Sequence, residues 1–399
     1  MSPLPEKHAG RIALAVVILL ISLNLRPSIT AVGPLIEYVR HDLKLSGALA
    51  GLLTTMPLLA FAFVSPWAPA IGRRLGMERA IFLALLLLSA GILLRSAPPV
   101  FALYAGAALL AGAIAIGNVL VPALIKRDFP DKIGVMTSVF ATSMAVSGSL
   151  SAGIAVPIAD TIYGGWRGSM AVWFAPAILT ALFLLPRLRR APPSPATAEA
   201  QVKHNVWRSK LAWQVTAFMG LQSMSFYVML TWLPSILQGQ GMSAANAGWM
   251  LAIFTALGIA VGFVLPPLMA RLNDQRMLAA GASVLMMSGY AGMIFFPALT
   301  LLWALIVGVA VGTSFLLALS FFSLRAANAQ QAAALSGMAQ SVGYSVAAAG
   351  PVVFGALHDL TQGWRVPLAM VVVTSAVQTF LAWRAGRKAH VGDSSDTRL

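Results

Sequence analysis

Long apolar runs recur along almost the whole chain. A helix that crosses a membrane needs about 20 mostly apolar residues. Twelve runs of roughly this length lie near residues 12–36, 46–71, 79–96, 100–125, 134–159, 168–187, 211–236, 245–270, 277–296, 299–324, 332–357 and 366–385. Their lengths favour helices over a barrel, whose strands would alternate in polarity over about ten residues. The sequence therefore predicts an all-α polytopic membrane protein with twelve transmembrane helices.

The composition agrees with a surface that faces a lipid bilayer. Only 10% of the residues are charged and 59% are hydrophobic, whereas about 25% charged residues is typical of soluble domains. The absence of cysteine excludes disulfides, thiolate metal sites and cysteine nucleophiles. A net charge of +15 indicates nucleic-acid binding only when the charges cluster on one folded face. Here they are spread over short loops, so no nucleic-acid partner is expected.

The distribution of the 27 Lys and Arg residues predicts the orientation. If the N-terminus is cytoplasmic, the outer loops hold only Arg40, Lys44, Arg95, Arg167 and Arg365. Arg26 lies inside a span, and the remaining basic residues fall in inner loops and tails. Such an excess is typical of cytoplasmic loops. We therefore expect an even number of spans in a bacterial inner membrane, with both termini cytoplasmic.

The chain is predicted to consist of two related halves. Residues 1–189 form an N-terminal six-helix bundle, 190–210 a cytoplasmic linker rich in Pro, Ala and charge, and 211–399 a C-terminal six-helix bundle. Arg127, Ser138, Ala141, Ser143, Ser147 and Gly165-Trp166-Arg167 recur at one constant offset as Arg325, Ser336, Ala339, Ser341, Ser345 and Gly363-Trp364-Arg365. Two parallel six-helix repeats, related by an axis along the membrane normal, are an arrangement that transporters use.

Several stretches resemble the major facilitator superfamily, and within it the cyanate permease and 2-nitroimidazole exporter family. They are NLRPSITAVGPL, GLLTTMPLLAFAFVSP, RRLGMERA, GNVLVPALIKRDFP and QQAAALSGMAQSVGY. The likeness covers the whole chain and is greatest to the 2-nitroimidazole exporter branch. The resemblance implies the superfamily's two-bundle fold, an alternating-access mechanism and a monomeric transporter.

The resemblance also implies a gating loop between the second and third spans, where this chain departs from the superfamily pattern. The first half has Arg73-Arg74-Leu75-Gly76, with Arg73 where the superfamily usually has an acid. The second half has Arg271 at the corresponding place. Glu78 and Asp274 are the candidates to replace the missing acid.

Arg26 is the charged residue near the middle of a predicted span. An Arg there costs roughly 2.5–3.5 kcal/mol on insertion scales, so it usually faces a water-filled cavity or a partner. Its guanidinium stays charged and can hold a planar anion by two parallel hydrogen bonds. Thr30 lies on about the same helical face. We expect Arg26 to bind substrate; the alternative is a structural Arg that binds carbonyls freed near Pro27.

The remaining polar candidates for substrate binding are neutral. They are Asn24, Asn118, Gln222, Tyr227, Gln340 and Tyr344. Neutral polar residues in spans often make interhelical hydrogen bonds worth about 0.6 kcal/mol, so a packing role is the alternative for each. Four tryptophans near span ends are expected to anchor the protein at the membrane interface. These are Trp67, Trp166, Trp232 and Trp364.

The chemistry that is missing limits the mechanism. No Walker pattern is present, so transport is expected to use ion or solute gradients, without cofactor or metal. All acids fall in loops, tails or span ends, so no carboxylate stands out as a proton carrier. Coupling through Glu37, co-transport of a proton with a weak acid, and no coupling all stay open.

The sequence predicts a transporter of a small, planar, polar compound. Export of 2-nitroimidazole-like organics is the first hypothesis, and uptake of a small anion such as cyanate is the alternative. An ion channel would need charged or carbonyl rings at a filter, and a membrane-embedded enzyme would need a His/Asp/Glu constellation in the spans. The sequence contains neither pattern.

Overall fold

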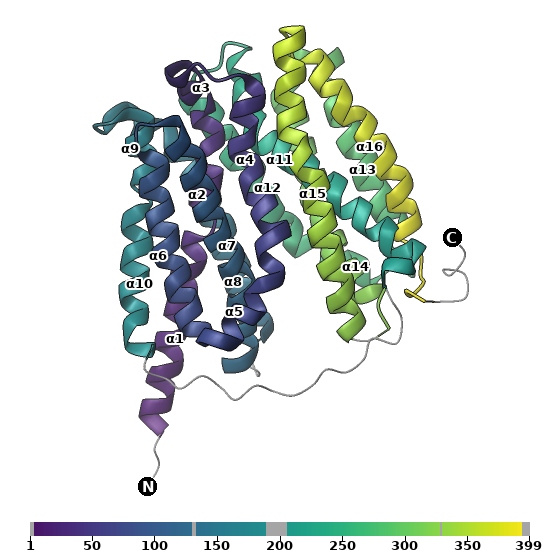
Figure 1. Cartoon of the computed structure of the whole chain (residues 1–399). Helices are drawn as coiled ribbons and strands as arrows, with labels where there is room; N and C mark the ends of the chain where they lie inside the picture. Colours follow the sequence, from purple (N-terminus) through teal and green to yellow (C-terminus); the bar gives the residue numbers. More distant parts are fainter. Residues whose placement is uncertain (1–3, 130–132, 189–205, 328, 393–399) are drawn as a thin grey trace.

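The computed structural model describes residues 4–129, 133–188, 206–327 and 329–392. Within these ranges every regular element is a helix. The helices form two bundles that lie side by side, one purple to blue and the other green to yellow (Figure 1). The predicted linker, 190–210, lies mostly outside the described residues, and its boundaries stay predictions.

The helices follow one another with short connections. The first half contains α1 (Leu4–Asn24), α2 (Pro27–Thr30), α3 (Val32–Leu43), α4 (Gly47–Val64), α5 (Ala68–Leu75), α6 (Met77–Ser96), α7 (Val100–Asp128), α8 (Ile133–Thr161), α9 (Gly165–Ala171) and α10 (Phe174–Leu184). The second half contains α11 (Lys210–Gln238), α12 (Ala244–Ala270), α13 (Arg276–Phe295), α14 (Thr300–Leu324), α15 (Ala329–Thr361) and α16 (Arg365–Ala385).

The number of membrane crossings agrees with the sequence. Among the described residues ten helices are long and apolar enough to cross a membrane, and α1 to α3 make an eleventh crossing that is bent by 40°. The 29 residues of α11 are long enough for another, although its polar side chains make it less apolar than the rest. Within the described ranges eleven of the twelve expected crossings are thus supported by length and hydropathy, and α11 by length alone.

In each half, an arginine at the end of one helix bonds to a residue at the start of another, and the two arginines lie at equivalent positions. Arg127, in the last turn of α7, donates to Glu78 in the first turn of α6. Arg325, directly after α14, donates to Gln275 Oε1, directly before α13, at 2.7 Å. The sequence repeat pairs these two arginines, so the structure confirms the pseudo-symmetry. Hydrogen bonds to Asp128 and Glu78 raise the pKa of Arg127, whereas burial lowers the pKa of Arg325 to about 10.

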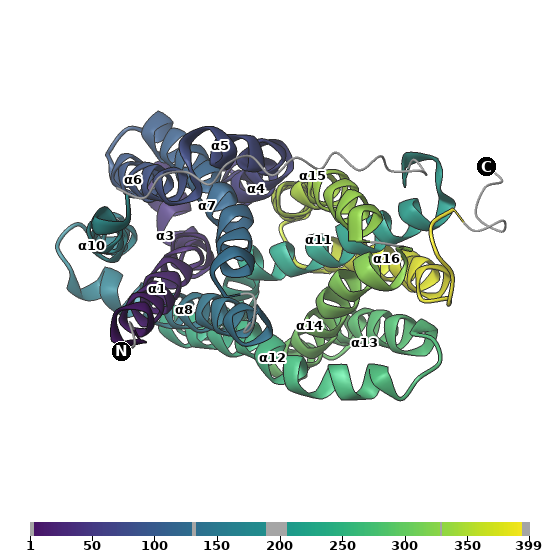
Figure 2. The same cartoon turned by 90° about the horizontal axis from the view of Figure 1, so that it is seen from below.

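The halves meet along α4 with α15 and along α8 with α12, which Figure 2 shows side by side. We call the end of the bundle where α1 begins the near end, and the opposite end the far end. A Cβ atom at Gly51 would lie 2.5 Å from the Pro351 carbonyl oxygen, and one at Gly355 would lie 2.4 Å from the Gly47 oxygen. No larger residue fits at these distances, so glycine permits the backbones of α4 and α15 to touch.

Charged groups join the halves at the far end. Arg40 Nη2 donates to Asp359 Oδ1 at 3.2 Å, and the Gly47 backbone N–H donates to the second Asp359 oxygen at 2.6 Å. Ser235 Oγ donates to Glu37 Oε1 at 2.6 Å. The Arg40–Asp359 pair is partly exposed, so its own contribution is modest, about 1 kcal/mol or less.

Further cross-half hydrogen bonds lie deeper in the bundle. The hydroxyls of Thr231 and Thr54 are 2.6 Å apart, and Thr55 donates to the Ala348 oxygen at 2.8 Å. Toward the near end the described residues show one more bond on the α4–α15 line, the long 3.4 Å contact of Ser341 Oγ with the Ala62 oxygen. In Figure 1 the ribbons of α4 and α15 likewise come closest toward the far end. The halves are therefore closed against each other at the far end.

Of the predicted gating-loop residues, Arg73 and Arg74 belong to the last turn of α5, Gly76 lies between α5 and α6, and Arg271 follows α12. Arg74 and Arg271 are exposed, and the side chain of Arg73 is outside the described part. Gly76 joins α5 to α6 with φ of 85°, a left-handed conformation that favours glycine. Glu78, one of the two candidate acids, is the one paired with the α7 arginine. A gating role for the loop stays a prediction.

Three expectations about position are wrong. Trp232 is fully buried and donates to the Pro351 oxygen at 2.9 Å, and Trp166 is 6% exposed and donates to Asp42 at 3.1 Å. Neither lies at the lipid interface, because each indole N–H finds its partner between helices. Arg95, expected in an outer loop, belongs to the last turn of α6 and is only 2% exposed.

Neutralising Asp359 is expected to loosen the far-end contact. Asp359→Asn removes the charge that Arg40 contacts, and a loss of about 1 kcal/mol would change the ratio of closed to open forms about fivefold. Because the chain has no cysteine, spin labels at Tyr163→Cys and Phe296→Cys, both exposed at the far end, report the distance between the halves. The variant should populate longer distances.

The matched control is Asp160→Asn, which removes an acid at the same end that contacts Tyr38 within the first half. It should leave the distance distribution unchanged. Equal distributions for the wild type and both variants would contradict a role for Asp359 in closing the far end.

Candidate functional site

The first span is broken at Arg26. The helix α1 ends at Asn24, and α2 begins at Pro27, which has no N–H to continue the α-helical hydrogen bonds. The Arg26 carbonyl accepts from the N–H groups of Ile29 at 2.9 Å and Thr30 at 3.1 Å. The Arg26 side chain is half-buried at this break in the middle of the span.

Groups from both halves surround Arg26. On the side of its own half, a Cβ at Gly148 of α8 would lie 3.2 Å from the Arg26 Cβ, so the glycine gives the side chain room. From the second half, the Tyr227 hydroxyl of α11 lies within interaction range of the Arg26 guanidinium. Tyr344 of α15 lies within reach of the same positive charge. The guanidinium therefore lies between the two halves.

Aromatic rings flank the two tyrosines. The ring of Phe61, on α4, is 5.7 Å from that of Tyr344. Phe226 lies edge-on to Tyr227 at 5.2 Å and stacks with Phe254 at 6.5 Å. Aromatic faces can pack against a planar ligand, and a guanidinium can bind its acceptor atoms. The combination suits a small planar polar compound.

Two of the predicted polar residues make contacts within the first half. Thr30 Oγ1 bonds to the Gly148 oxygen at 2.9 Å and to Ser151 Oγ at 2.6 Å, which joins α2 to α8 directly beside Arg26. The Asn24 amide donates to Thr180 Oγ1 at 2.9 Å and so is directed to α10. Thr30 therefore lies with Arg26, whereas Asn24 lies on the other side of the span.

The three remaining amides have no recorded contact with Arg26. Gln222 donates to Ser223 Oγ at 2.8 Å, and Gln340 donates to Ser336 Oγ at 2.8 Å. Among the described residues no partner reaches the buried oxygens Gln222 Oε1 and Asn118 Oδ1. These oxygens can accept a hydrogen bond, so the three residues stay predictions for the substrate site.

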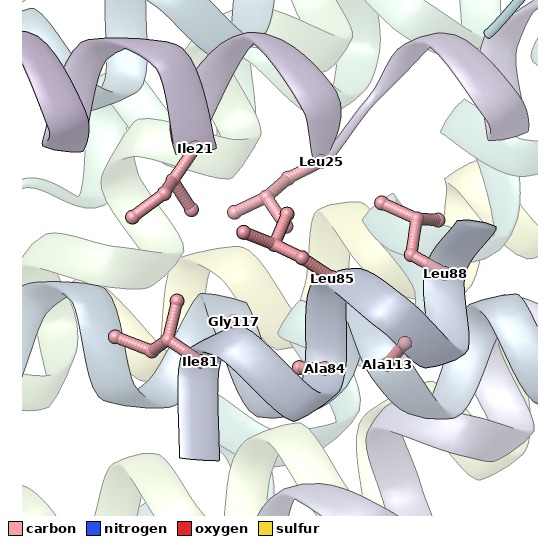
Figure 3. Close-up of a pocket in the computed structure, with 8 residues that line it drawn as sticks. All are labelled: Ile21, Leu25, Ile81, Ala84, Leu85, Leu88, Ala113 and Gly117. Carbon is pink, nitrogen blue, oxygen red and sulfur yellow. The ribbon is translucent and has the colours of Figure 1, made fainter. Parts of the chain in front are cut away.

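An apolar void lies inside the first half. It is lined by side chains of α1, α6 and α7, among them Ile21, Ile81 and Leu88, and by Leu25, which directly follows α1 (Figure 3). Gly117 also borders it, and a Cβ there would meet Leu25 at 2.8 Å. The lining offers no polar group, so we assign this void to packing. The described residues also contain no cluster of three metal-ligating side chains.

Arg40 and Asp359, which make the far-end contact, were not among the predicted functional residues, and Glu37 was predicted only as one option for coupling. All three had a partial signal in the sequence, because they are charged residues at the ends of spans. The missing information is which span end faces which, and only the packing of α3 and α4 against α11 and α15 supplies it.

Comparisons with known proteins all point to the same family of transporters. The family model of the Major Facilitator Superfamily matches residues 13–351. An uncharacterized transporter of Bacillus subtilis is 41% identical over 99% of both chains. The 2-nitroimidazole transporter of Escherichia coli K12 is 41% identical over 95% of this chain and 96% of its own. A cyanate transport protein of the same organism is 31% identical over 86% of this chain and 90% of its own.

The solved structures agree on the fold. A D-xylose–proton symporter superposes with a TM-score of 0.77 at 15% identity, covering 94% of this chain and 98% of its own. A bacterial homologue of the lysosomal transporter Spinster, in an inward-facing and occupied conformation, gives 0.76 at 16% identity and covers 97% and 98%. By sequence match and by fold, this chain belongs to the Major Facilitator Superfamily of transporters.

Proposed function

We propose that this transporter carries a small planar polar compound and binds it at Arg26. The observation that supports this proposal is the position of the guanidinium in the middle of the first span, between Tyr227 and Gly148 from opposite halves. Among the described residues Arg26 forms no ion pair. A half-buried cation without a counter-charge attracts a ligand with negative or strongly accepting atoms.

The relatives suggest two substrate classes. One relative is named for 2-nitroimidazole and another for cyanate. A nitro group presents two oxygens that can accept parallel bonds from a guanidinium, and the rings of Phe61 and Phe226 suit a flat heterocycle. We therefore propose export of 2-nitroimidazole-like compounds. The uncompensated charge of Arg26 favours uptake of a small anion such as cyanate as the second candidate.

The distribution of basic residues supports one orientation of the molecule in the membrane. The near end carries most of the basic residues outside the spans, as cytoplasmic loops do. We propose that it faces the cytoplasm in a bacterial inner membrane, with both termini inside, and that the protein works as a monomer. The closed far end is then periplasmic. Glu37 is our candidate for proton coupling, because it bonds across the halves where external protons arrive.

Arg26→Ala is expected to weaken ligand binding at least about tenfold, because a charged hydrogen bond contributes about 1.5–3 kcal/mol. The measurement is a thermal-shift titration of the detergent-purified protein with 2-nitroimidazole, cyanate, nitrate and small carboxylates. Arg26→Lys keeps the charge but loses the planar pair of donors, so it should bind cyanate better than it binds 2-nitroimidazole.

The control for this series is Arg365→Ala, which removes an exposed arginine at the far end. It should bind like the wild type. If Arg26→Ala keeps wild-type affinity for a ligand that stabilises the wild type, Arg26 is structural, and the site moves to the Gln340 and Tyr344 face of α15.

The hydroxyl of Tyr227 is expected to matter for binding, because it lies beside Arg26 and can hydrogen-bond to the guanidinium or to a ligand. Tyr227→Phe should raise the dissociation constant about tenfold, the range expected for the loss of one hydrogen bond to a charged group. The matched control is Tyr290→Phe, which removes a hydroxyl bonded to Ser225 within the second half. The control should lose stability without losing affinity. Equal affinities in both variants would contradict the role of Tyr227.

Transport direction has its own test. Inside-out and right-side-out vesicles loaded with the protein should differ in how fast they accumulate labelled 2-nitroimidazole. Export predicts faster accumulation in inside-out vesicles, and an advantage for right-side-out vesicles would favour the uptake alternative.

A further inference from the structure

A second arginine is buried in the first half, away from the space between the halves. Arg95 lies in the last turn of α6 and is 2% exposed. A Cβ at Gly106 of α7 would lie 2.2 Å from the Arg95 backbone nitrogen, so the two helices touch at this level. The side chain is therefore enclosed by packed helices and is not reaching a surface.

The Arg95 guanidinium is only partly satisfied. Its Nη1 donates to the Ser28 carbonyl in α2 at 2.5 Å. Among the described residues its Nε and Nη2 have no hydrogen-bond partner, and neither does the Ser28 hydroxyl, which is 1% exposed. Nε and Nη2 are the two parallel donors that an arginine presents to a planar anion. The arginine whose Nη1 contacts Ser28 thus has an unused two-donor edge, and Ser28 has an unused hydroxyl.

The surrounding carboxylates do not neutralise Arg95. At this end of the first half Glu37 contacts Arg40, Asp42 contacts Arg167, and Asp160 accepts from Tyr38. No ion pair within the described ranges includes Arg95. The nearest charged residue along the contacted segment is Arg26, two positions before Ser28, and it carries the same sign.

A buried charge in this position needs an opposite charge. Buried ions in proteins are paired or neutralised, and arginine stays protonated. A water molecule could satisfy the two N–H groups but would leave the charge uncompensated, whereas an anion does both. We propose that the Nε and Nη2 groups of Arg95, with the Ser28 hydroxyl, bind a small monovalent inorganic anion such as a halide or nitrate inside the first half.

This anion site is separate from the proposed substrate site. Arg95 approaches the broken first span from α6, and the Arg26 side chain faces α8, α11 and α15. The bound anion would hold α2, the short helix that follows Arg26, against α6. The proposal therefore does not rest on substrate identity, and either site can fail alone.

The test is a thermal-shift series in nitrate, bromide and gluconate at constant ionic strength, performed in an Arg26→Ala background to remove the substrate site. A saturable rise of a few degrees in nitrate or bromide over gluconate is expected. Arg95→Gln should abolish the rise. Arg40→Gln, which removes an ion-paired arginine at the same end, should keep it.

A structural measurement covers the case in which Arg95→Gln does not fold. Crystals of the unaltered protein grown in bromide should show an anomalous peak within hydrogen-bonding distance of Arg95 Nη2. An ordered water with no anomalous signal at this position would overturn the proposal. A rise in nitrate or bromide that persists in folded Arg95→Gln protein would overturn it as well.

Discussion

A guanidinium in the middle of a membrane span requires polar neighbours, and the meeting of the two halves supplies them to Arg26. The break between α1 and α2 brings the side chain to the interface, where the Tyr227 hydroxyl of the other half interacts with it. This arrangement needs the halves in contact, and the glycines of α4 permit that contact at Pro351 and Gly355. The polar surroundings of Arg26 therefore depend on the helix packing that brings the two halves together.

The closure of the halves is uneven, and their cross-half hydrogen bonds concentrate toward the far end. Small residues, hydroxyls and the Arg40–Asp359 pair gather toward the far end. At the near end each half instead uses an internal device, Glu78 with Arg127 in one and Gln275 with Arg325 in the other. These pairs hold each bundle together as a unit. Two firm units joined mainly at one end are what alternating access requires.

The sequence predicts the fold well, because apolar run length and the repeat are local properties of the chain. It also selects Arg26, whose charge is costly wherever it lies in the span. The errors share a different cause. Asn24 and Arg26 are two residues apart, yet the helix break sends the Asn24 amide to α10. Arg95 and Trp232 lie near predicted span ends but are buried by helices distant in sequence, and no local pattern reports such neighbours.

The most direct test of the central claim is a structure of the protein with 2-nitroimidazole or cyanate bound. Ligand density between the Arg26 guanidinium and the hydroxyls of Tyr227 and Tyr344, in contact with both halves, is the predicted result. Density confined to one half, or a bound ligand with no contact to Arg26, would contradict the assignment of Arg26 as the substrate-binding residue.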